Sequence, residues 1–310
     1  MKLAMVGLGR MGANMAERLR RHGHEVVGYD RNPDVSEAPD LGGLVAGLGT
    51  GPRVAWVMVP SGTPTDEIIT ELGALLSAGD IVVDGGNSNW RDSQRHGQEL
   101  GARGIGFVDC GTSGGVWGLE EGYCLMVGGA PEHVAVVQPA FDALAPAGGF
   151  AHVGPVGAGH FTKMVHNGIE YGIMQSYAEG YELLQAVDIE LDADAALQVW
   201  RSGSVVRSWL LDLLCLAIEQ DPGLTSFQGF ASDSGECRWT VDEAVRLAVP
   251  VPVISSALFA RFASRQEVSP AMQVISALRS QFGGHAEQAI DRRPAETVDG
   301  RADTGKVVPG

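Results

Sequence analysis

A lysine and a glutamate stand seven positions apart in the segment KMVHNGIEYG, within a stretch that is expected to be helical. At about 100° per residue, Lys163, Asn167 and Glu170 fall within a sector of roughly 60°, flanked by His166 and Tyr171. Lys163 and Glu170 are roughly 10 Å apart along the axis, too far for the i,i+4 pair of a charged helix surface. An exposed charged face remains the alternative, but the gap leaves room for a small substrate between a base and an acid.

Glycines interrupt the same helical stretch, which is expected to cover residues 158–186. Each glycine in a helix interior lowers stability by roughly 1 kcal/mol relative to alanine. We expect close packing against a cofactor or substrate to explain their presence. The glycines in and just before the stretch are Gly157, Gly159, Gly168 and Gly172.

A nucleotide-binding turn is indicated by GLGRMG, which places Gly7, Gly9 and Gly12 after a first strand and at the opening of a helix. Such glycines allow backbone N–H groups to approach a pyrophosphate at a helix N-terminus. The second strand ends at Asp30, whose carboxylate suits an adenosine ribose and would repel a 2′-phosphate. We therefore predict NAD over NADP, with NADP as a weaker alternative because the neighbouring Arg31 could bind that phosphate.

Two later strands end in VMVPSG and VDGGNS, at the edge where ligand crevices of such sheets open. Val59, Pro60 and Asn87 are therefore candidates for the nicotinamide end of the site. For Pro60, a simple turn residue is an equally good interpretation. The cofactor-binding set also includes the remaining residues of the glycine turn, Leu8, Arg10 and Met11.

The elements that must position these residues divide the chain in two. Short aliphatic runs alternate with amphipathic stretches over the first 150 residues, which predicts a parallel sheet covered by helices. From about residue 158 the pattern is mainly helical. We expect an α/β Rossmann-type domain at residues 1–156, an all-helical substrate and dimerisation domain at 157–286, and a flexible tail at 287–310.

Composition narrows the function classes. A net charge of −16 disfavours nucleic acid and anionic membranes as partners, so a local basic pocket must capture an anionic ligand. No apolar run reaches the roughly 18 residues of a membrane helix, so the cytoplasm is the expected location. The four cysteines form no CxxC pair, and we expect them to be reduced, with no metal site.

Several motifs together resemble 6-phosphogluconate dehydrogenase, the decarboxylating enzyme of the oxidative pentose phosphate route. They are GLGRMGANMAERL, DGGNS, the SGG of FVDCGTSGGVWGLEEG, GAGHFTKMVHNGIEYGIMQ and RWT…VPVPVISSALFARF…RSQFGGH. The resemblance runs in order from residue 1 to about residue 286, and the HNGIEY continuation separates this chain from 3-hydroxyacid dehydrogenases. The chain is similar to the short form of the family, whose members often use NAD.

The resemblance implies a role for each group of the first motif. Lys163 would be the base that takes the 3-hydroxyl proton, which requires a neutral lysine, and Glu170 would be the acid that protonates the carbon from which CO₂ leaves. His166 and Asn167 would hold the substrate, and Asn87 would lie between nicotinamide and substrate. The substrate carboxylate would be bound by Ser113, Gly114 and Gly115.

The phosphate of 6-phosphogluconate needs fixed cations, and arginine suits it because its planar fork binds two oxygens. The resemblance implies that a neighbouring subunit completes the site, so the protein is expected to be a homodimer or homotetramer. The implied phosphate ligands are Tyr171, Arg238, Thr240 and Arg261, with Arg279 and His285 from the neighbour.

Two positions depart from the family pattern. Many relatives have lysine where this chain has Arg238, and an acidic pair where it has Val116 and Trp117. The alternatives are therefore an NAD-dependent 3-hydroxyacid dehydrogenase that acts on another aldonate or small hydroxyacid without decarboxylation, and a non-catalytic NAD-binding sensor. The acid and base of the helical motif argue against the sensor.

Overall fold

The computed structural model describes residues 1–283. Within that range, Met1–Ser264 form one compact unit, and the residues from Arg265 onward belong to a second unit that contains helix α12 (Pro270–Gly283). The tail that the sequence predicts at 287–310 lies outside the described residues.

A seven-stranded sheet forms the centre of the first unit, in the order β2-β1-β3-β4-β5-β6-β7. The first five strands of the chain run parallel, and most of their residues are buried, as expected for a sheet covered on both faces. The strands are β1 (Lys2–Val6), β2 (Glu25–Tyr29), β3 (Val54–Val57), β4 (Ile81–Asp84), β5 (Gly106–Ser113), β6 (Cys124–Gly129) and β7 (Phe150–Gly154).

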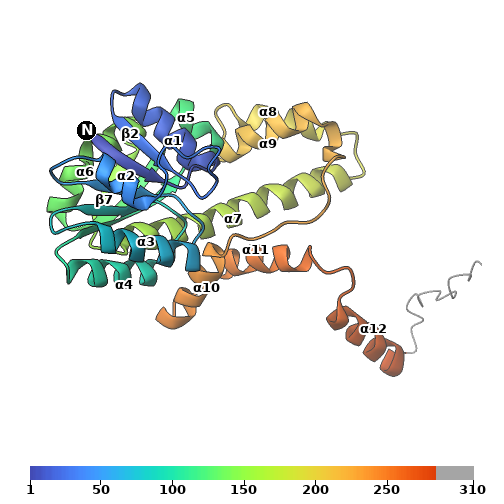
Figure 1. Ribbon diagram of the computed structural model, residues 1–310. Helices are drawn as coiled ribbons and strands as arrows, with labels where there is room; N and C mark the ends of the chain where they lie inside the picture. The colour runs from blue at the N-terminus through green and yellow to red at the C-terminus, as the bar shows by residue number, and fades with distance from the viewer. Residues whose placement is uncertain (284–310) are drawn as a thin grey trace, which may run out of the picture. The chain divides into compact units, whose positions relative to one another are not determined.

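Helices cover both faces of the sheet, so two hydrophobic cores form (Figure 1). In β1, Leu3 and Met5 lie in one core whereas Ala4 and Val6 lie in the other, because successive side chains of a strand point to opposite faces. The α/β Rossmann-type prediction is confirmed. The first core contains α1 (Arg10–Arg21) and α6 (Pro131–Leu144), and the second contains α2 (Leu41–Gly47), α3 (Thr63–Leu75) and α4 (Trp90–Gly101).

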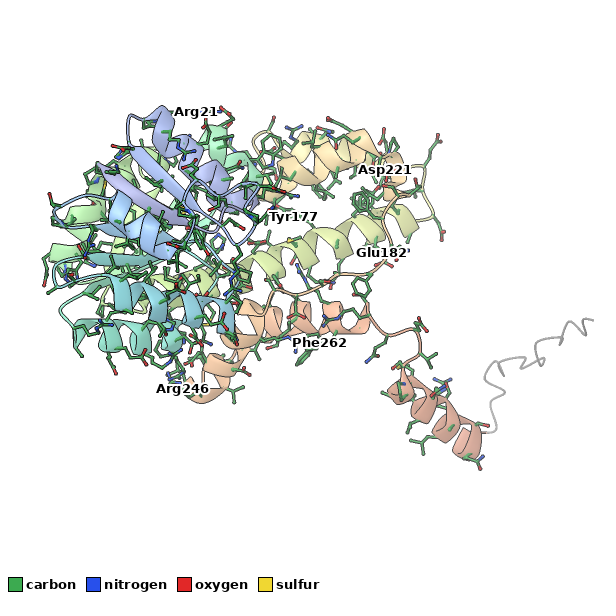
Figure 2. The ribbon with its side chains drawn as sticks, in the orientation of Figure 1. Arg21, Tyr177, Glu182, Asp221, Arg246 and Phe262 are labelled. Carbon is green, nitrogen blue, oxygen red and sulfur yellow. The ribbon has the colours of Figure 1, made fainter. Side chains whose placement is uncertain are left out.

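The second half of the chain is mainly helical, as the sequence predicts. Helix α7 (Ala158–Ala186) has the predicted bounds and packs against β5 and β6. Figure 2 labels Tyr177 on α7. Its hydroxyl shares a hydrogen bond of 2.9 Å with Ser208, the residue that caps helix α9. The other helices of the first unit are α5 (Gly118–Glu121), α8 (Ala193–Trp200), α9 (Trp209–Gln220), α10 (Glu236–Leu247) and α11 (Pro252–Ala263), with short turns η1 (Gly115–Trp117) and η2 (Pro222–Leu224).

The edge of the sheet differs from the prediction. The sequence predicts a parallel sheet, but β6 pairs antiparallel with β5, and β7 follows it at the edge. Only residues 114–123 connect β5 to β6, which is too short for the crossover that a parallel pair requires. Across residues 1–283, no helix has both the length and the apolar character needed to span a membrane.

The glycines of α7 pack against the protein itself. A Cβ at Gly159 would lie 2.5 Å from the carbonyl oxygens of Asp109 and Met126, and a Cβ at Gly168 would lie 2.9 Å from the Thr240 side chain. The expectation that a cofactor or substrate explains these glycines is therefore wrong. They let α7 lie directly on the backbone of β5 and β6 and close to α10.

Candidate active site

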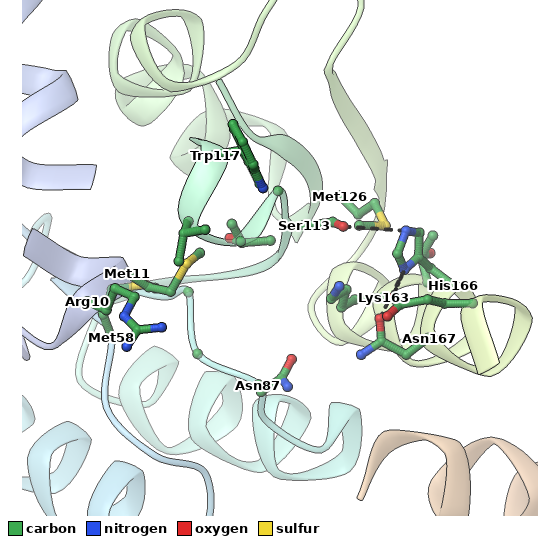
Figure 3. Close-up of a pocket in the computed structure, with 18 of the residues that line it drawn as sticks. Arg10, Met11, Met58, Asn87, Ser113, Trp117, Met126, Lys163, His166 and Asn167 are labelled. Carbon is green, nitrogen blue, oxygen red and sulfur yellow. Dashed lines mark hydrogen bonds and ion pairs between the residues drawn. The ribbon is translucent and has the colours of Figure 1, made fainter. Parts of the chain in front are cut away.

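A cleft of about 1310 Å³ opens beside the carboxyl ends of the parallel strands (Figure 3). The strand order changes direction between β1 and β3, and such a switch point is where ligand crevices form in open α/β sheets. The cleft brings the glycine turn and the start of α7 together. The predicted site residues that line it are Gly9, Arg10, Met11, Gly12, Val59, Pro60, Asn87, Ser113, Gly114, Gly115, Lys163, His166, Asn167 and Glu170.

The glycine turn has the backbone that a dinucleotide needs. Gly7 has a φ of +93°, and a Cβ there would lie 2.6 Å from the Met58 carbonyl oxygen. A Cβ at Gly12 would collide with the Gly7 carbonyl oxygen. Gly9 precedes α1 without a side-chain cap, and open space lies where its Cβ would be. The first N–H groups of α1 are therefore available to an anion in the cleft.

Asp30 joins the end of β2 to this turn. Its carboxylate accepts hydrogen bonds from the Leu8 N–H at 2.7 Å and the Asn32 N–H at 2.8 Å. The Arg31 guanidinium next to it donates to Glu67 of α3 at 2.7 Å, in an exposed pair. Among the predicted cofactor residues, Gly7, Leu8, Asp30 and Arg31 are not part of the cleft lining.

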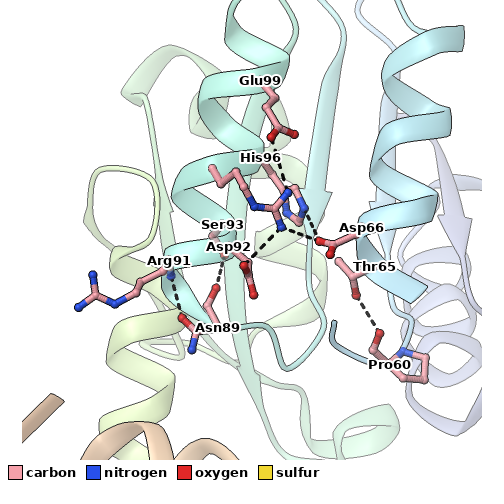
Figure 4. Close-up of polar contacts among 10 residues, drawn as sticks. Pro60, Thr65, Asp66, Asn89, Arg91, Asp92, Ser93, His96 and Glu99 are labelled. Atoms are coloured by element: carbon pink, nitrogen blue, oxygen red, sulfur yellow. Dashed lines mark hydrogen bonds and ion pairs between the residues drawn. The ribbon is translucent and has the colours of Figure 1, made fainter. Parts of the chain in front are cut away.

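Side-chain hydrogen bonds hold the two strand-end loops at the cleft (Figure 4). The Thr65 hydroxyl donates to the Pro60 carbonyl oxygen at 2.9 Å. The Asn89 side chain caps α4 by accepting from the Arg91 N–H at 2.9 Å, two residues after Asn87. The first contact ties the Pro60 loop to α3 and the second caps the start of α4, so each loop is held by the helix that follows it.

The start of α7 is fixed by a buried carboxylate. Asp109 of β5 accepts from the Gly157 N–H at 2.7 Å and from the His160 N–H at 2.8 Å. Negative charge at a helix N-terminus is stabilising, and these bonds satisfy two N–H groups that have no partner within the helix. The His160 ring also shares a hydrogen bond of 2.7 Å with Ser93 of α4. Two elements of the Rossmann domain thus determine where α7 begins.

Lys163 lies one turn inside α7 and is only 8% exposed. Gly111 of β5 makes this placement feasible, because any Cβ there would collide with the Cβ of Lys163. Burial lowers the pKa of Lys163 below its ordinary value, although the nearby carboxylates of Glu170 and Glu236 act to raise it. Within residues 1–283, its Nζ has no hydrogen-bond or ion-pair partner. The structure therefore presents a desolvated amine to the cleft.

A chain of hydrogen bonds leads away from the cleft through α7. Ser113 Oγ lies 3.5 Å from His166 Nε2, and His166 Nδ1 lies 3.0 Å from Asn167 Oδ1 (Figure 3). The Asn167 amide then donates to Glu236 Oε1 at 2.9 Å. Sequence reasoning missed Glu236, although an acidic residue two positions before Arg238 is visible in GECRWT.

Glu170 lies closer to solvent than Lys163. Its side chain is 36% exposed, and its Oε2 lies 3.9 Å from His166 Nδ1. The two-turn separation expected from the sequence is present, and within the described chain no ion pair joins Lys163 to Glu170. One wall of the cleft thus carries a buried amine and a more exposed carboxyl group.

The residues assigned to the substrate phosphate lie elsewhere, on the α10 and α11 side of α7. Tyr171 is buried, with the Arg261 guanidinium 3.4 Å from its ring centroid. Arg238 pairs with Asp233 at 2.7 Å, and the buried Thr240 hydroxyl donates to backbone carbonyls. None of these four predicted residues lines the cleft. Arg279 belongs to α12 of the second unit, and His285 lies outside the described residues.

An apolar rim of the cleft was not foreseen. Val116 and Trp117, the departures noted in the sequence, line it and are about half exposed. Trp209 and Leu213 of α9 line it as well. No spacing rule places α9 at the cleft, because its position depends on how the α8–α9 pair packs along α7.

The structure also shows where the four cysteines lie and how the possible metal ligands are arranged. Cys110, Cys215 and Cys237 are buried, Cys124 is exposed, and all four are free thiols. Burial raises the pKa of the Cys237 thiol to about 11. Among residues 1–283, no group of histidine, cysteine and carboxylate side chains has an arrangement that could hold a metal ion.

Comparison with protein families gives matches over nearly the whole described chain. The NAD binding domain of 6-phosphogluconate dehydrogenase matches residues 2–154, and the C-terminal domain of 6-phosphogluconate dehydrogenase matches residues 159–288. The NAD(+)-dependent, decarboxylating 6-phosphogluconate dehydrogenase of Haloferax volcanii is 40% identical over 296 residues, which cover 92% of this chain and 98% of the relative.

Solved structures show the same fold. A Plasmodium falciparum 6-phosphogluconate dehydrogenase matches with a TM-score of 0.74 and 23% identity, over 94% of this chain and 67% of that one. A Mycobacterium tuberculosis 3-hydroxyisobutyrate dehydrogenase matches with a TM-score of 0.70 and 24% identity, over 90% and 99%. At these identities the solved structures show the fold alone. The two matched domains and the 40% identical relative establish that the chain belongs to the 6-phosphogluconate dehydrogenase family.

Proposed function

We propose that the protein oxidises 6-phosphogluconate to ribulose 5-phosphate and CO₂, with NAD as the hydride acceptor. The observation that carries the proposal is the buried Lys163, which faces the same cleft as the glycine turn and Glu170. A solvated lysine is protonated near neutral pH and cannot act as a base. Burial lowers the pKa of Lys163, so a larger share of it is neutral.

Lys163 would take the proton of the substrate 3-hydroxyl while C3 loses a hydride. When bound, the nicotinamide ring of NAD accepts that hydride. The product is a 3-keto acid, in which the C1–C2 bond breaks because the carbonyl group takes up the bonding electrons as CO₂ leaves. Protonated Lys163 then donates a hydrogen bond to the oxygen of the enediol that forms.

Glu170 would supply the proton for the carbon from which CO₂ has left. This role needs a carboxyl group that is protonated at that step and lies apart from the base. Glu170 meets the second condition, because it is two turns from Lys163 on the same helix and has no ion pair with it in the described chain. Acid and base therefore address different carbons of one bound sugar.

The residues of the glycine turn fit NAD. Gly9 leaves open space where a side chain would block a pyrophosphate, Gly7 and Gly12 allow the tight packing of the turn, and α1 offers uncapped N–H groups to the ligand. Asp30 would bind the adenosine ribose and disfavour the 2′-phosphate of NADP. Arg31, which could favour that phosphate, is paired with Glu67. We therefore propose NAD as the preferred cofactor.

Ser113, Gly114, Gly115, His166 and Asn167 would bind the sugar acid, because they line the cleft next to Lys163. The phosphate would require a further set of groups. We propose that Tyr171, Arg238, Thr240 and Arg261 serve it together with Arg279 and His285 of a second copy, which makes the enzyme a dimer or tetramer.

A direct assay tests the proposal: 6-phosphogluconate is incubated with NAD or NADP, and reduced cofactor and CO₂ are followed together. We expect both products in equal amounts and a higher kcat/KM with NAD.

A 3-hydroxyacid dehydrogenase that does not decarboxylate is the second candidate, because the apolar rim at Val116 and Trp117 suits a less polar substrate. Reduced cofactor without CO₂, or equal rates with unphosphorylated hydroxyacids, would decide for that candidate.

A further inference from the structure

Glu236 stands at the end of the hydrogen-bonded chain that begins at Ser113, and it belongs to none of the predicted site residues. It is the first residue of α10, is only 2% exposed and does not line the cleft. Its Oε1 accepts from the Asn167 amide, whereas its Oε2 is buried and has no hydrogen-bond partner among residues 1–283. A buried carboxylate oxygen without a partner is unfavourable. A contribution to the stability of α10 alone therefore does not explain why a glutamate is buried at this position.

The position of Glu236 at the start of α10 explains part of its presence. Gly235 precedes the helix without a side-chain cap, so the negative charge of Glu236 lies where the helix dipole favours it. This structural role would be served by any acidic group in the first turn. It does not require the bond from Asn167 on the neighbouring helix α7.

That bond fixes the direction of every donor in the chain. Glu236 Oε1 accepts a hydrogen bond, so the Asn167 amide nitrogen faces it and Asn167 Oδ1 faces His166. An amide oxygen can only accept, so His166 must carry its proton on Nδ1. The Glu170 carboxylate, 3.9 Å from the same nitrogen, favours the same tautomer. His166 Nε2 then presents a lone pair toward Ser113 and the cleft.

The charge of Glu236 also affects Lys163, the proposed base. The titratable groups that face Lys163 are Glu170 on its own helix, Glu236 on α10 and Cys124 on β6. Burial lowers the pKa of Lys163, and the Glu236 carboxylate partly offsets this by raising it. Removal of the Glu236 charge should therefore make Lys163 easier to deprotonate.

We propose that Glu236 is a positioning residue of the reaction centre: it holds the Asn167 amide and, through it, keeps His166 in the Nδ1–H tautomer, with Nε2 as a hydrogen-bond acceptor for the substrate. The proposal rests on the proposed function where it concerns 6-phosphogluconate. The orientation of Asn167 and His166 is a property of the protein alone.

Two variants separate geometry from charge. Glu236→Asp keeps the charge but shortens the side chain by one methylene, so the bond to Asn167 is lost. Glu236→Gln keeps the length and an acceptor oxygen but removes the charge. Glu243→Gln is the matched control, because Glu243 is a buried acid of the same helix whose partners Arg91 and Arg246 do not line the cleft.

Kinetics and melting temperature are measured for all three variants. Glu236→Asp should lower kcat/KM for 6-phosphogluconate by about tenfold to a hundredfold and leave the Kd for NAD unchanged, since small misplacements of positioning groups have effects of this size. Glu236→Gln should move the acid limb of the kcat/KM profile to lower pH. Glu243→Gln should change the melting temperature but neither kinetic quantity.

The His166 tautomer gives a readout that is independent of turnover. Nitrogen-15 NMR should show the Nδ1–H form in the wild type and a mixed population in Glu236→Asp, with the His166 signal identified from its loss in His166→Gln. If the tautomer, kcat/KM and acid limb all stay at wild-type values while only the melting temperature falls, Glu236 merely supports α10 and the proposal is wrong. If the wild type does not turn over 6-phosphogluconate, the proposed function fails, and the tautomer still decides the role of Glu236.

Discussion

Lys163 and Glu170 lie on one helix, but their surroundings differ, and the difference sets what each can do. Lys163 is packed against the Gly111 backbone, where solvent contributes little to the stability of its charged form. Glu170 lies two turns later and is 36% exposed on the side chain. The protein therefore favours a neutral amine at the inner position and leaves the carboxyl group accessible at the outer one.

Replacement of Lys163 by methionine tests its role as the base. Methionine keeps most of the side-chain volume and removes the amine, so turnover should fall by several orders of magnitude while NAD still binds with nearly unchanged Kd. Steady-state kinetics and NAD titration by tryptophan fluorescence give the two quantities. Lys2→Met at the half-buried start of β1, away from the cleft, is the control. Surviving turnover in Lys163→Met would exclude the proposed mechanism.

The pH dependence of the wild type follows from the same burial. Burial holds the pKa of Lys163 below the ordinary lysine value, and only the neutral amine can take the hydroxyl proton. The rate should therefore fall as the pH falls through this lowered pKa, since Lys163 then becomes protonated. A pH profile of kcat/KM, which reports groups of the free enzyme, measures it. An acid limb at the pH where solvated lysines titrate would contradict the assignment.

We expect Asp30 to govern the choice between NAD and NADP through its charge. Asp30→Asn keeps an oxygen that can accept from the Leu8 N–H but removes the charge that would repel a 2′-phosphate. The ratio of kcat/KM for NAD over NADP should fall by about tenfold, which corresponds to about 1.4 kcal/mol. Asp34→Asn, an exposed change in the same loop, should leave the ratio unchanged. An unaltered ratio in Asp30→Asn would show that the preference arises elsewhere.

At the scale of elements, the sequence predicted what local pattern determines. Helix α7 has the predicted bounds, and the glycine turn lies between β1 and α1 as its motif requires. The missed strand β6 pairs antiparallel with β5 because the connection between them is too brief for a crossover, and β7 then pairs parallel with β6 after the crossover helix α6. Tyr171 shows a second limit of local pattern. Helical spacing places it beside the polar sector of α7, but only the packing of α10 and α11 shows that this side of α7 is buried.

The contact between β5 and α7 is the element-scale feature that places Lys163 at the cleft. Asp109 accepts two N–H groups of the α7 start, and an asparagine could accept only one of them. Asp109→Asn should therefore lower the free energy of unfolding by about 2 kcal/mol and reduce kcat. Denaturant unfolding and steady-state kinetics measure both. Asp142→Asn on the exposed side of α6 should stay within about 0.5 kcal/mol of the wild type, and equal effects of the two changes would refute the capping role.

At the scale of the whole molecule, the proposed phosphate site needs more cations than the cleft supplies. With a net charge of −16, the chain needs local cations to hold an anionic sugar, and Arg10 is among the few basic residues that line the cleft. Helix α12 carries Arg279 and also exposes Met272, Ile275 and Leu278. Exposed apolar side chains on a helix suit contact with a second copy. A site shared between two copies would account for both the need for further cations and the exposed apolar side chains of α12.

Subunit complementation tests the shared site directly. Lys163→Met and Arg279→Ala should each lower activity severely as homo-oligomers, because one lacks the proposed base and the other lacks the proposed phosphate ligand. In a mixed dimer, one site would combine Lys163 of one chain with Arg279 of the other, so it would be intact, whereas the second site would carry both changes. Random coexpression makes half of the dimers mixed, and we expect about one quarter of wild-type activity to return. If each chain instead supplied both residues to its own site, every site would carry one lesion and coexpression would restore nothing.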